Sequence, residues 1–368
     1  MSTHRAIATV AKGSVDEILL PTGAPGAGEV LLKHSYAAMI AYDTYQADLG
    51  YGVDSYPLVL GITASGVVVD VGPGVTGITA GDRVVGATFH TPLARGLQEY
   101  SIQPRNLIAK IPHELPFDQA ATIPDNFVTA FYTIFNQLGF PIPDFPAKLE
   151  SPPQASAPIL VYGAGATSGQ YAIQLLYAAG YTNIIATAST KHHDYLRSLG
   201  ASSVFDYRSP TLVEDIGKAA GGDGKVQYAI DSITSQGTIA TIAKVISPSG
   251  TLALLLPIKE GSSVRGAPGA QMLWELPDAW NVLPKGTKYV GVRTFLYEQA
   301  SICLMCDEFL KENLMPKILP RLLDLHLVKP SKVLLLDQGS FKERVAEGLD
   351  LLRNNRVSGE KVVVKIDP

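Results

Sequence analysis

One stretch near the middle of the chain restricts the possible folds most, because an apolar run, a glycine-rich turn and a helical pattern follow one another directly. Residues 159–162 are Ile-Leu-Val-Tyr, a run that predicts a buried parallel strand. The turn contains Gly163, Gly165 and Gly169, and helical periodicity continues to Leu176. Glycines let a backbone approach phosphates closely, and a helix N-terminus offers unpaired N–H groups. The stretch therefore predicts a site for a dinucleotide pyrophosphate.

The turn departs from the G-x-G-x-x-G spacing, because Ser168 stands where the last glycine is expected. Glycine clusters also mark ordinary tight turns, so the turn alone leaves both interpretations open. The residues that follow favour the nucleotide site, because strands and helices alternate. Strands are predicted over 183–188, 203–205, 226–230 and 250–256, and helices over 192–199, 211–219 and 236–246. Alternation at this spacing predicts an α/β fold with a doubly wound parallel sheet.

The remainder of the chain reads as β-rich at both ends. In the N-terminal part, strands are predicted over 4–10, 29–37, 66–71, 83–87 and 98–102, and helices over 116–121 and 127–138. In the C-terminal part, strands are predicted over 288–294, 332–336 and 361–366, and helices over 299–312 and 341–354. Residues 140–158 contain six prolines and are expected to be exposed and mobile. Residues 257–287 form a second irregular stretch.

Composition excludes several classes of protein. The chain has 368 residues, enough for two domains, and a net charge of −4 offers no footprint for nucleic acid. No apolar run is long enough to cross a bilayer, and the N-terminus has no signal-peptide core, so we expect no membrane partner and a cytoplasmic protein. Cys303 and Cys306 have the C-x-x-C spacing of a redox pair or half a zinc site. Their amphipathic helical surroundings and the absence of a second pair favour packing.

Several local sequences together resemble one known superfamily. Residues 66–86 contain V-x-x-V-G-x-x-V and G-D-R-V, Asp206 and Tyr207 follow the third strand of the alternating region, and residues 358–363 are Ser-Gly-Glu-Lys-Val-Val. The chain resembles the medium-chain dehydrogenase/reductase superfamily. It looks most like the zinc-free quinone oxidoreductase and enoyl reductase branch, and its two irregular stretches resemble the fungal trans-acting enoyl reductases. The resemblance implies a GroES-like β domain (1–126 and 300–368) and a Rossmann domain (127–299).

The resemblance also predicts that no metal is bound. Zinc-dependent alcohol dehydrogenases of this superfamily have Gly-His-Glu where this chain has residues 61–63, Gly-Ile-Thr. They have a cysteine three residues before an aspartate that matches Asp43, and here that position is Ile40. Isoleucine cannot ligate a metal. Carbonyl reduction uses zinc as a Lewis acid, whereas conjugate reduction places charge on an enolate that hydrogen bonds can hold, so reduction of an activated C=C bond is favoured.

The end of the second Rossmann strand indicates which nicotinamide cofactor binds. NAD enzymes place an acid there, and residues 186–191, Ala-Thr-Ala-Ser-Thr-Lys, contain none. Ser189 and Lys191 offer a hydroxyl and a cation that suit a 2′-phosphate, although Lys191 could also be an ordinary solvated lysine. The resemblance adds Tyr207, beside the adenosine phosphate. We therefore predict NADPH, bound by Gly163, Gly165, Ala166, Thr167, Ser168, Ser189, Lys191 and Tyr207.

The resemblance suggests two catalytic residues. Enoyl thioester reductases carry a tyrosine shortly after an Asn-Pro-x-Asp motif, which is degenerate here, and Tyr51 lies near the corresponding offset. Tyr42 and Tyr45 are rival proton donors, and all three could instead be packing residues. Thr129 matches a family position near the nicotinamide. The alternative to this functional role is that Thr129 is an ordinary helix threonine whose hydroxyl bonds to its own helix backbone.

Three functions remain open from the sequence. The first is an NADPH-dependent reductase of enones, enals or enoyl thioesters, with a small unsaturated carbonyl substrate that is either free or held on a polyketide synthase carrier protein. The alternatives are an NADPH quinone oxidoreductase and a non-catalytic NADPH-binding protein. Turnover with NADPH and a panel of alkenes and quinones separates the three.

Overall fold

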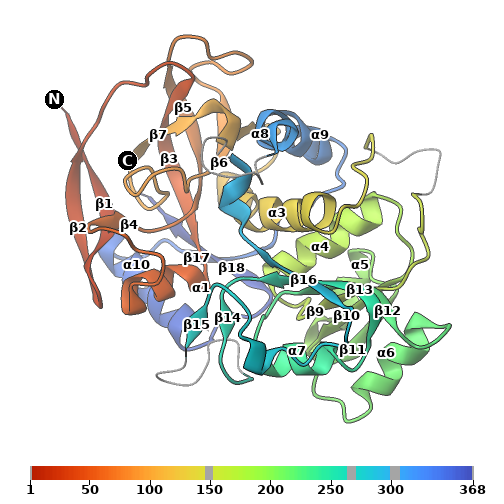
Figure 1. Cartoon of the computed structure of the whole chain (residues 1–368). Coiled ribbons are helices and arrows are strands. Elements are labelled where there is room, and N and C mark those ends of the chain that lie inside the picture. The colour runs from red at the N-terminus through yellow and green to blue at the C-terminus, as the bar shows by residue number, and fades with distance from the viewer. Residues whose placement is uncertain (1, 146–151, 263–270, 299–306, 367–368) are drawn as a thin grey trace. The chain divides into compact units, whose positions relative to one another are not determined.

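The protein is described from a computed structural model, which covers residues 2–145, 152–262, 271–298 and 307–366 (Figure 1). The chain divides into two compact units, Met1–Asp125 with Tyr297–Pro368, and Asn126–Leu296. The first unit is therefore assembled from both ends of the chain, and the second is a continuous insertion between them.

The second unit contains a six-stranded parallel sheet. Its strands in spatial order are β11 (Ser203–Asp206), β10 (Ile184–Ala188), β9 (Ile159–Tyr162), β12 (Val226–Asp231), β13 (Ile246–Leu255) and β16 (Lys288–Val292). Numbered by first appearance along the chain, the order is 3-2-1-4-5-6, so the direction of winding reverses between β9 and β12. The predicted doubly wound sheet is confirmed, and the glycine turn follows its first strand.

Helices cover both faces of this sheet. They are α4 (Thr167–Ala178), α5 (His193–Ser198), α6 (Leu212–Ala220) and α7 (Gln236–Ile242). Leu160 of β9 shares a buried cluster with Ile216 of α6 and Ile239 of α7. Helix α4 lies on the other side of the strands (Figure 1). Because both faces are covered, all four residues of β9 are buried, which explains why the strand reads as an uninterrupted apolar run.

The helix predicted over 236–246 is shorter than expected. It ends at Ile242, because Ile246 already begins β13 and pairs with Val226 of β12. Both Ile242 and Ile246 are fully buried, so their apolar character fits either a helix or a strand. Only the pairing with β12 distinguishes the two.

The proline-rich insertion is also anchored more firmly than its composition suggests. Phe140 is buried, and its ring centroid lies 4.8 Å from that of Tyr181 and 4.6 Å from that of Tyr228. Phe145 is buried against Phe135, with centroids 6.2 Å apart. The prediction of an exposed stretch is therefore wrong for these aromatic side chains, and residues 146–151 lie outside the described residues.

The second irregular stretch contains some regular structure. Strands β14 (Ile258–Lys259) and β15 (Met272–Leu273) form a short antiparallel pair, and a 3-10 turn spans Asp278–Trp280. The stretch therefore begins with a β-pair beside the end of β13.

The first unit is built mainly from antiparallel strands. One sheet has the order β2 (Ser14–Pro21), β1 (Thr3–Ala11), β4 (Leu58–Val59). The larger sheet has the order β17 (Lys332–Leu336), β18 (Glu360–Lys365), β3 (Glu29–Met39), β5 (Thr63–Val71), β6 (Arg83–Ala87), β8 (Ile108–Lys110), with β7 (Tyr100–Pro104) also paired to β3. Strands β2, β4 and β8 were not expected, because β2 is largely exposed and β4 and β8 are only two and three residues long.

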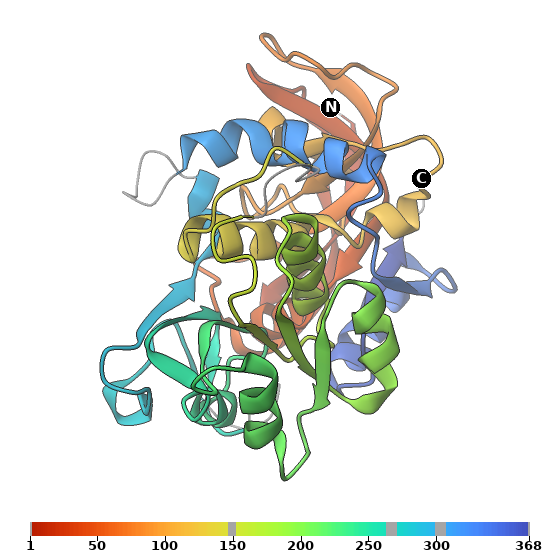
Figure 2. The same ribbon diagram turned by 90° about the vertical axis from the view of Figure 1, so that its right-hand side faces the viewer.

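Short helices complete the first unit. They are α1 (Ala41–Thr44), α2 (Phe117–Ala120), the start of α3 (Pro124–Phe131), α8 (Glu308–Asn313), α9 (Leu319–Asp324) and α10 (Phe341–Arg353). Figure 2 shows α8 and α9 as one continuous helical rod, because the π-helical turn Leu314–Ile318 joins them. Helix α10 begins with a capping box between Ser340 and Glu343, and Val345 packs with Val362 of β18 in the core.

Part of the C-terminal prediction cannot be compared with the structure. Cys303, Cys306 and most of the helix expected over 299–312 lie outside the described residues, and α8 starts after its N-cap, Asp307. Among the helices that the structure describes, none has the length and apolar character required to span a bilayer.

Candidate active site

The glycine turn after β9 is fixed by hydrogen bonds to β10. The Gly163 N–H donates to Thr187 Oγ1 (2.9 Å), and the Ala164 N–H donates to the Thr187 carbonyl oxygen (2.8 Å). Gly163 has a φ of +72°, and a Cβ at this position would lie 2.3 Å from the Ile233 side chain. Any larger residue would therefore meet both backbone strain and a steric clash, so the turn requires glycine here.

Gly169, rather than residue 168, makes the close contact between helix and strand. A Cβ on Gly169 would lie 2.6 Å from the Ala164 Cα. In the G-x-G-x-x-G motif the last glycine allows the helix to approach the strand closely. Here Gly169 allows this approach instead of residue 168, so Ser168 does not disrupt the turn.

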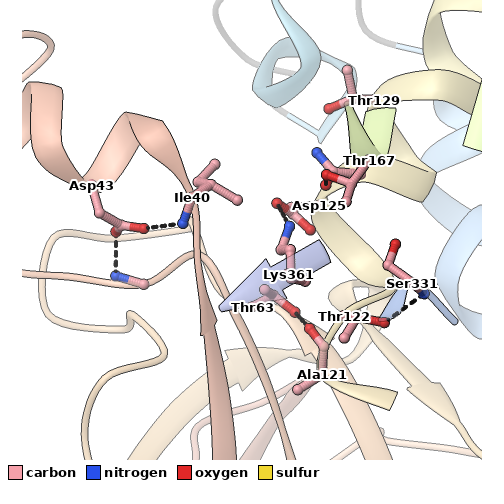
Figure 3. A network of polar contacts seen from close by, with 12 residues as sticks. Ile40, Asp43, Thr63, Ala121, Thr122, Asp125, Thr129, Thr167, Ser331 and Lys361 are labelled. Carbon is pink, nitrogen blue, oxygen red and sulfur yellow. Dashed lines mark hydrogen bonds and ion pairs between the residues drawn. The ribbon is translucent and has the colours of Figure 1, made fainter. Parts of the chain in front are cut away.

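The N-terminus of α4 is open to an anion. Its N-cap, Ala166, has no side chain that could accept from the first N–H groups of the helix, so those donors lack a side-chain cap. The Thr167 hydroxyl donates to Asn126 Oδ1, which orients this side chain at the helix start (Figure 3). A helix of this length with uncapped N–H groups can bind a phosphate.

Polar residues follow the two strands beyond the turn. Ala188 of β10 pairs with Asp206 of β11, so Ser189 and Tyr207 come next at the same edge of the sheet. The Asp206 carboxylate accepts from Arg208 Nε (2.9 Å) and Nη2 (2.7 Å), and these bonds lower the pKa of Asp206 to about 2. The Arg208 guanidinium lies 5.4 Å from the centroid of the Tyr207 ring. Lys191 is exposed at the same edge.

A buried polar cluster shapes the loop after β12. Asp231 Oδ1 accepts from the N–H groups of Ile233 (3.0 Å) and Thr234 (2.8 Å). These bonds place Ile233 against Gly163, across the point where the winding reverses. Burial raises the pKa of Asp231 and lowers the pKa of nearby Lys259 to about 8, although the Asp231 charge opposes the latter shift.

Thr129 lies on α3 with its hydroxyl 3.2 Å from the hydroxyl of Thr294. The Thr129 carbonyl oxygen accepts from Thr133 Oγ1 (2.7 Å). The hydroxyl that bonds to the helix backbone is therefore that of Thr133, whereas the Thr129 hydroxyl contacts Thr294. The Thr129 side chain is half-buried.

Asp43 ties together two segments of the first unit. Its carboxylate accepts from the N–H of Ile40 (2.8 Å) and the N–H of Gly61 (2.7 Å), as Figure 3 shows. Asp43 is fully buried, and burial raises its pKa while these two hydrogen bonds oppose the shift. An aspartate is therefore required here to hold the two segments together.

The three candidate tyrosines lie close in sequence but in different settings. The ring of Tyr51 meets the ring of Tyr42 edge to face, with centroids 6.0 Å apart. Tyr45 is buried in the π-helical turn Tyr45–Leu49, and its carbonyl oxygen accepts from the Tyr51 N–H (3.1 Å). Burial raises the pKa of Tyr42, so its phenol stays protonated at neutral pH.

Comparison with known proteins identifies the family. Residues 26–113 match the alcohol dehydrogenase GroES-like domain, and residues 169–262 match the zinc-binding dehydrogenase family. Trans-enoyl reductase himH of Aspergillus japonicus is 31% identical over 343 residues, which cover 92% of this chain and 90% of the relative. The chain belongs to the medium-chain dehydrogenase/reductase superfamily.

Other members of the superfamily support this identification. The enoyl reductase component lovC of the lovastatin nonaketide synthase from Aspergillus terreus is 32% identical over 317 residues, covering 84% of this chain and 82% of lovC. The crystal structure of CurK enoyl reductase matches with a TM-score of 0.73 at 22% identity, over 99% of both chains, a likeness that shows the fold alone. The resemblance drawn from residues 66–86 and 358–363 is confirmed.

The zinc-ligand positions of the superfamily can now be placed in the fold. Ile40 precedes α1, and Ile62 precedes β5. The match to the zinc-binding dehydrogenase family spans residues 169–262 and includes neither position. Within the described ranges, no group of three or more His, Cys, Asp or Glu side chains could hold a metal ion.

Several polar residues of this site were not found from the sequence. Arg208 follows the predicted Tyr207 directly, and a basic residue just after a parallel strand is a signal that could have been used. Asp231 and Lys259 are 28 positions apart, and Gln46 and Arg95 are 49 apart. Pairs separated so widely leave no periodic pattern, so only the folded chain reveals them.

Proposed function

We propose that this protein is an NADPH-dependent reductase that transfers hydride to the activated C=C bond of an enone, enal or enoyl thioester, without zinc, in the cytoplasm. The observation that carries the proposal is the pair Ile40 and Ile62. These residues stand at two of the zinc-ligand positions expected from the family resemblance, in a chain that keeps the nucleotide turn and is 31% identical to a trans-enoyl reductase. A carbonyl reductase of this superfamily would lack its usual Lewis acid, whereas an enolate can be stabilised by hydrogen bonds.

The residues of the second unit fit a dinucleotide. Gly163 has the positive φ of a tight turn and packs closely against Ile233, and the α4 N-terminus has no side-chain cap. We assign the pyrophosphate to the turn 163–168 and the 2′-phosphate to Ser189 and Lys191, with Tyr207 beside the adenosine. Arg208 is a second cation at this edge, although Asp206 partly neutralises it. When bound, NADPH supplies the hydride.

The protein side chains supply positioning and a proton. The Thr129 hydroxyl is held toward Thr294, a geometry that suits a group that orients the nicotinamide ring. We assign Tyr51 as the acid that delivers a proton from its Oη to the substrate α-carbon, with Tyr42 and Tyr45 as rivals. A phenol, whose usual pKa is about 10, is protonated at neutral pH and can serve as a general acid.

The substrate is a small unsaturated carbonyl compound. The relative lovC is named as the enoyl reductase component of a polyketide synthase, which supports delivery of the substrate as a thioester on a carrier protein. A free enone and a carrier-bound thioester share the same reacting group, so both belong to the proposed substrate class.

Product analysis tests this proposal. The purified protein is incubated with NADPH or NADH and with an α,β-unsaturated aldehyde, a cyclic enone, a crotonyl thioester and a benzoquinone. We expect the saturated aldehyde, ketone and thioester, and faster turnover with NADPH. Predominant formation of the allylic alcohol, or turnover of the quinone alone, would contradict the proposal.

A further inference from the structure

In the part of the chain that the structure describes, the Arg95 guanidinium has no ion-pair partner and lies in the first unit near Tyr42. Arg95 is in the loop that follows β6, and its Nη1 lies 3.5 Å from Gln46 Oε1. Its Nε is buried without a hydrogen-bond partner. Arg95 forms no ion pair with any residue that the structure describes. Arg95 as a whole is partly exposed, but a buried N–H group without a partner is costly, so the arrangement favours an anion that arrives from outside.

The nearest acid does not fill this role. Asp43 acts on Arg95 through space, but its two carboxylate oxygens are engaged by the N–H groups of Ile40 and Gly61. Burial lowers the pKa of Arg95, and its interactions with Tyr42 and Asp43 only partly oppose this shift. The guanidinium nevertheless remains charged at neutral pH, because its unperturbed pKa is above about 12.

Gln46 adds a second unused donor. Its side chain is fully buried, its Oε1 faces Arg95, and its Nε2 has no hydrogen-bond partner. Turning the amide round would place its N–H groups against the guanidinium N–H groups, so the orientation seen here is the favourable one. Gln46 Nε2, which also interacts with Tyr42, and Arg95 Nε thus bring two N–H donors to one place.

The loop that carries Arg95 is held rigidly. The Arg95 carbonyl oxygen accepts from Gln98 Nε2 (2.7 Å), and the Gly96 N–H donates to the Gly61 carbonyl oxygen (2.7 Å). The Gly96 carbonyl oxygen lies 2.9 Å from His34 Nδ1. These bonds fix the backbone from which the Arg95 side chain extends, and donors on a fixed backbone need less reorganisation to stabilise developing charge.

The same cluster reaches the candidate acid. Tyr42 interacts with both Gln46 and Arg95, and its ring packs edge to face on Tyr51. An anion held by Arg95 would therefore lie in the part of the first unit that also carries Tyr42 and Tyr51.

We propose that Arg95, assisted by Gln46, binds the oxygen of the substrate carbonyl and stabilises the negative charge that forms on it during conjugate reduction. The inference rests on the proposed function. Hydride adds to the β-carbon, the C=C π pair becomes a π bond between the α-carbon and the carbonyl carbon, and the C=O π pair moves onto the oxygen, which becomes a negatively charged enolate oxygen. A proton added at the α-carbon then restores the carbonyl. Arg95 gains and loses no proton in this sequence, so its role is electrostatic.

The test uses a stable enolate. Acetylacetone ionises to an enolate with its own ultraviolet absorption, and its binding requires no hydride transfer. We expect the wild-type protein to favour the enolate over the neutral form by about tenfold to a hundredfold, the range of a charge-assisted hydrogen bond. Arg95→Gln should lose this preference, and Arg95→Lys should retain part of it. Gln46→Glu should also lose it, because the new carboxylate pairs with Arg95.

Controls separate this role from folding and from the proposed function. Arg105→Gln removes a different partly buried guanidinium of the first unit, which binds backbone carbonyl oxygens, and should leave the enolate preference unchanged. In enone turnover, Arg95→Gln should lower kcat by the same factor by which it lowers the preference for the enolate. The thermal unfolding midpoint of Arg95→Gln should stay near that of Arg105→Gln. An unchanged enolate spectrum or kcat in Arg95→Gln would overturn the inference. A wild-type protein that binds the enolate through Arg95 but reduces no alkene would contradict the proposed function and leave the anion site standing.

Discussion

Lys361 of β18 and Asp125 in the first turn of α3 form an ion pair whose side chains are only 2% and 3% exposed. The two residues are 236 positions apart and join the C-terminal segment to the start of α3 (Figure 3). Lys361 Nζ donates to Asp125 Oδ2, and Asp125 Oδ1 has no hydrogen-bond partner among the described residues. Removing Lys361 would therefore leave the Asp125 carboxylate without a hydrogen-bond donor.

Lys361→Met should destabilise the protein by about 3–5 kcal/mol, because it leaves the Asp125 carboxylate buried and unpaired. Denaturant unfolding measures this change. The double variant with Asp125→Leu serves as the control, and should recover most of the loss because no buried charge remains. A loss below about 1 kcal/mol for the single variant, the size of an exposed ion pair, would contradict the account.

Gly163→Ala should weaken both nucleotide binding and stability, because the new methyl group meets Ile233 at 2.3 Å. Gly221→Ala is a matched control: it has a similar φ of +68° but no atom within 4 Å of its added Cβ. The control should lose about 1–3 kcal/mol from backbone strain alone, because Gly221 also has a ψ of −169°. Equal losses of unfolding free energy in the two variants would show that Ile233 does not constrain the turn.

Lys191→Ala should weaken NADPH binding by about tenfold to a hundredfold, because it removes a charge-assisted contact to the 2′-phosphate, and should leave NADH binding unchanged. Fluorescence titration of both nucleotides measures the two affinities. Lys218→Ala is the control, because Lys218 is an exposed lysine paired with Glu214 on α6. A parallel loss of NADH affinity would assign Lys191 a structural role instead.

Lys259 should make the stability of the protein rise with pH above about 8. Its pKa is about 8 in the folded protein, against an ordinary value of 10.5, so the unfolded chain binds more protons between these two pH values. The gain across this window is roughly 3 kcal/mol. From pH 8 to 10, the unfolding free energy of the wild type should therefore rise relative to that of Lys259→Met. A constant difference over that range would mean that Lys259 titrates normally.

Tyr51→Phe should lower kcat by about tenfold to a hundredfold without changing NADPH affinity, because it removes the acid and keeps the ring that packs on Tyr42. Water can protonate an enolate, so we expect the lower end of the range for general acid catalysis. Tyr42→Phe and Tyr45→Phe are measured in parallel under conditions where hydride transfer limits the rate. Turnover of Tyr51→Phe at the wild-type rate would show that Tyr51 is a packing residue. The proton donor would then be solvent or another residue.

The amino-acid sequence alone determined those parts of the protein that depend on neighbouring residues. An uninterrupted apolar run, the glycines of residues 163–169 and a helical period were sufficient to predict β9, the turn and α4. The regular alternation after them predicted the doubly wound sheet, because each strand is buried on both faces and each helix on one. The family resemblance followed from similarly local motifs.

The tertiary structure alone decided which distant residues meet. The sequence predicted that Phe140 belongs to an exposed proline-rich loop, whereas in the structure its ring packs against Tyr181 and Tyr228. Ile246 could have ended a helix until its pairing with Val226 placed it in β13. Arg95 had no visible role before Gln46 was brought beside it. Burial and the loss of water around a charge are properties of the assembled chain, so no window of consecutive residues contains them.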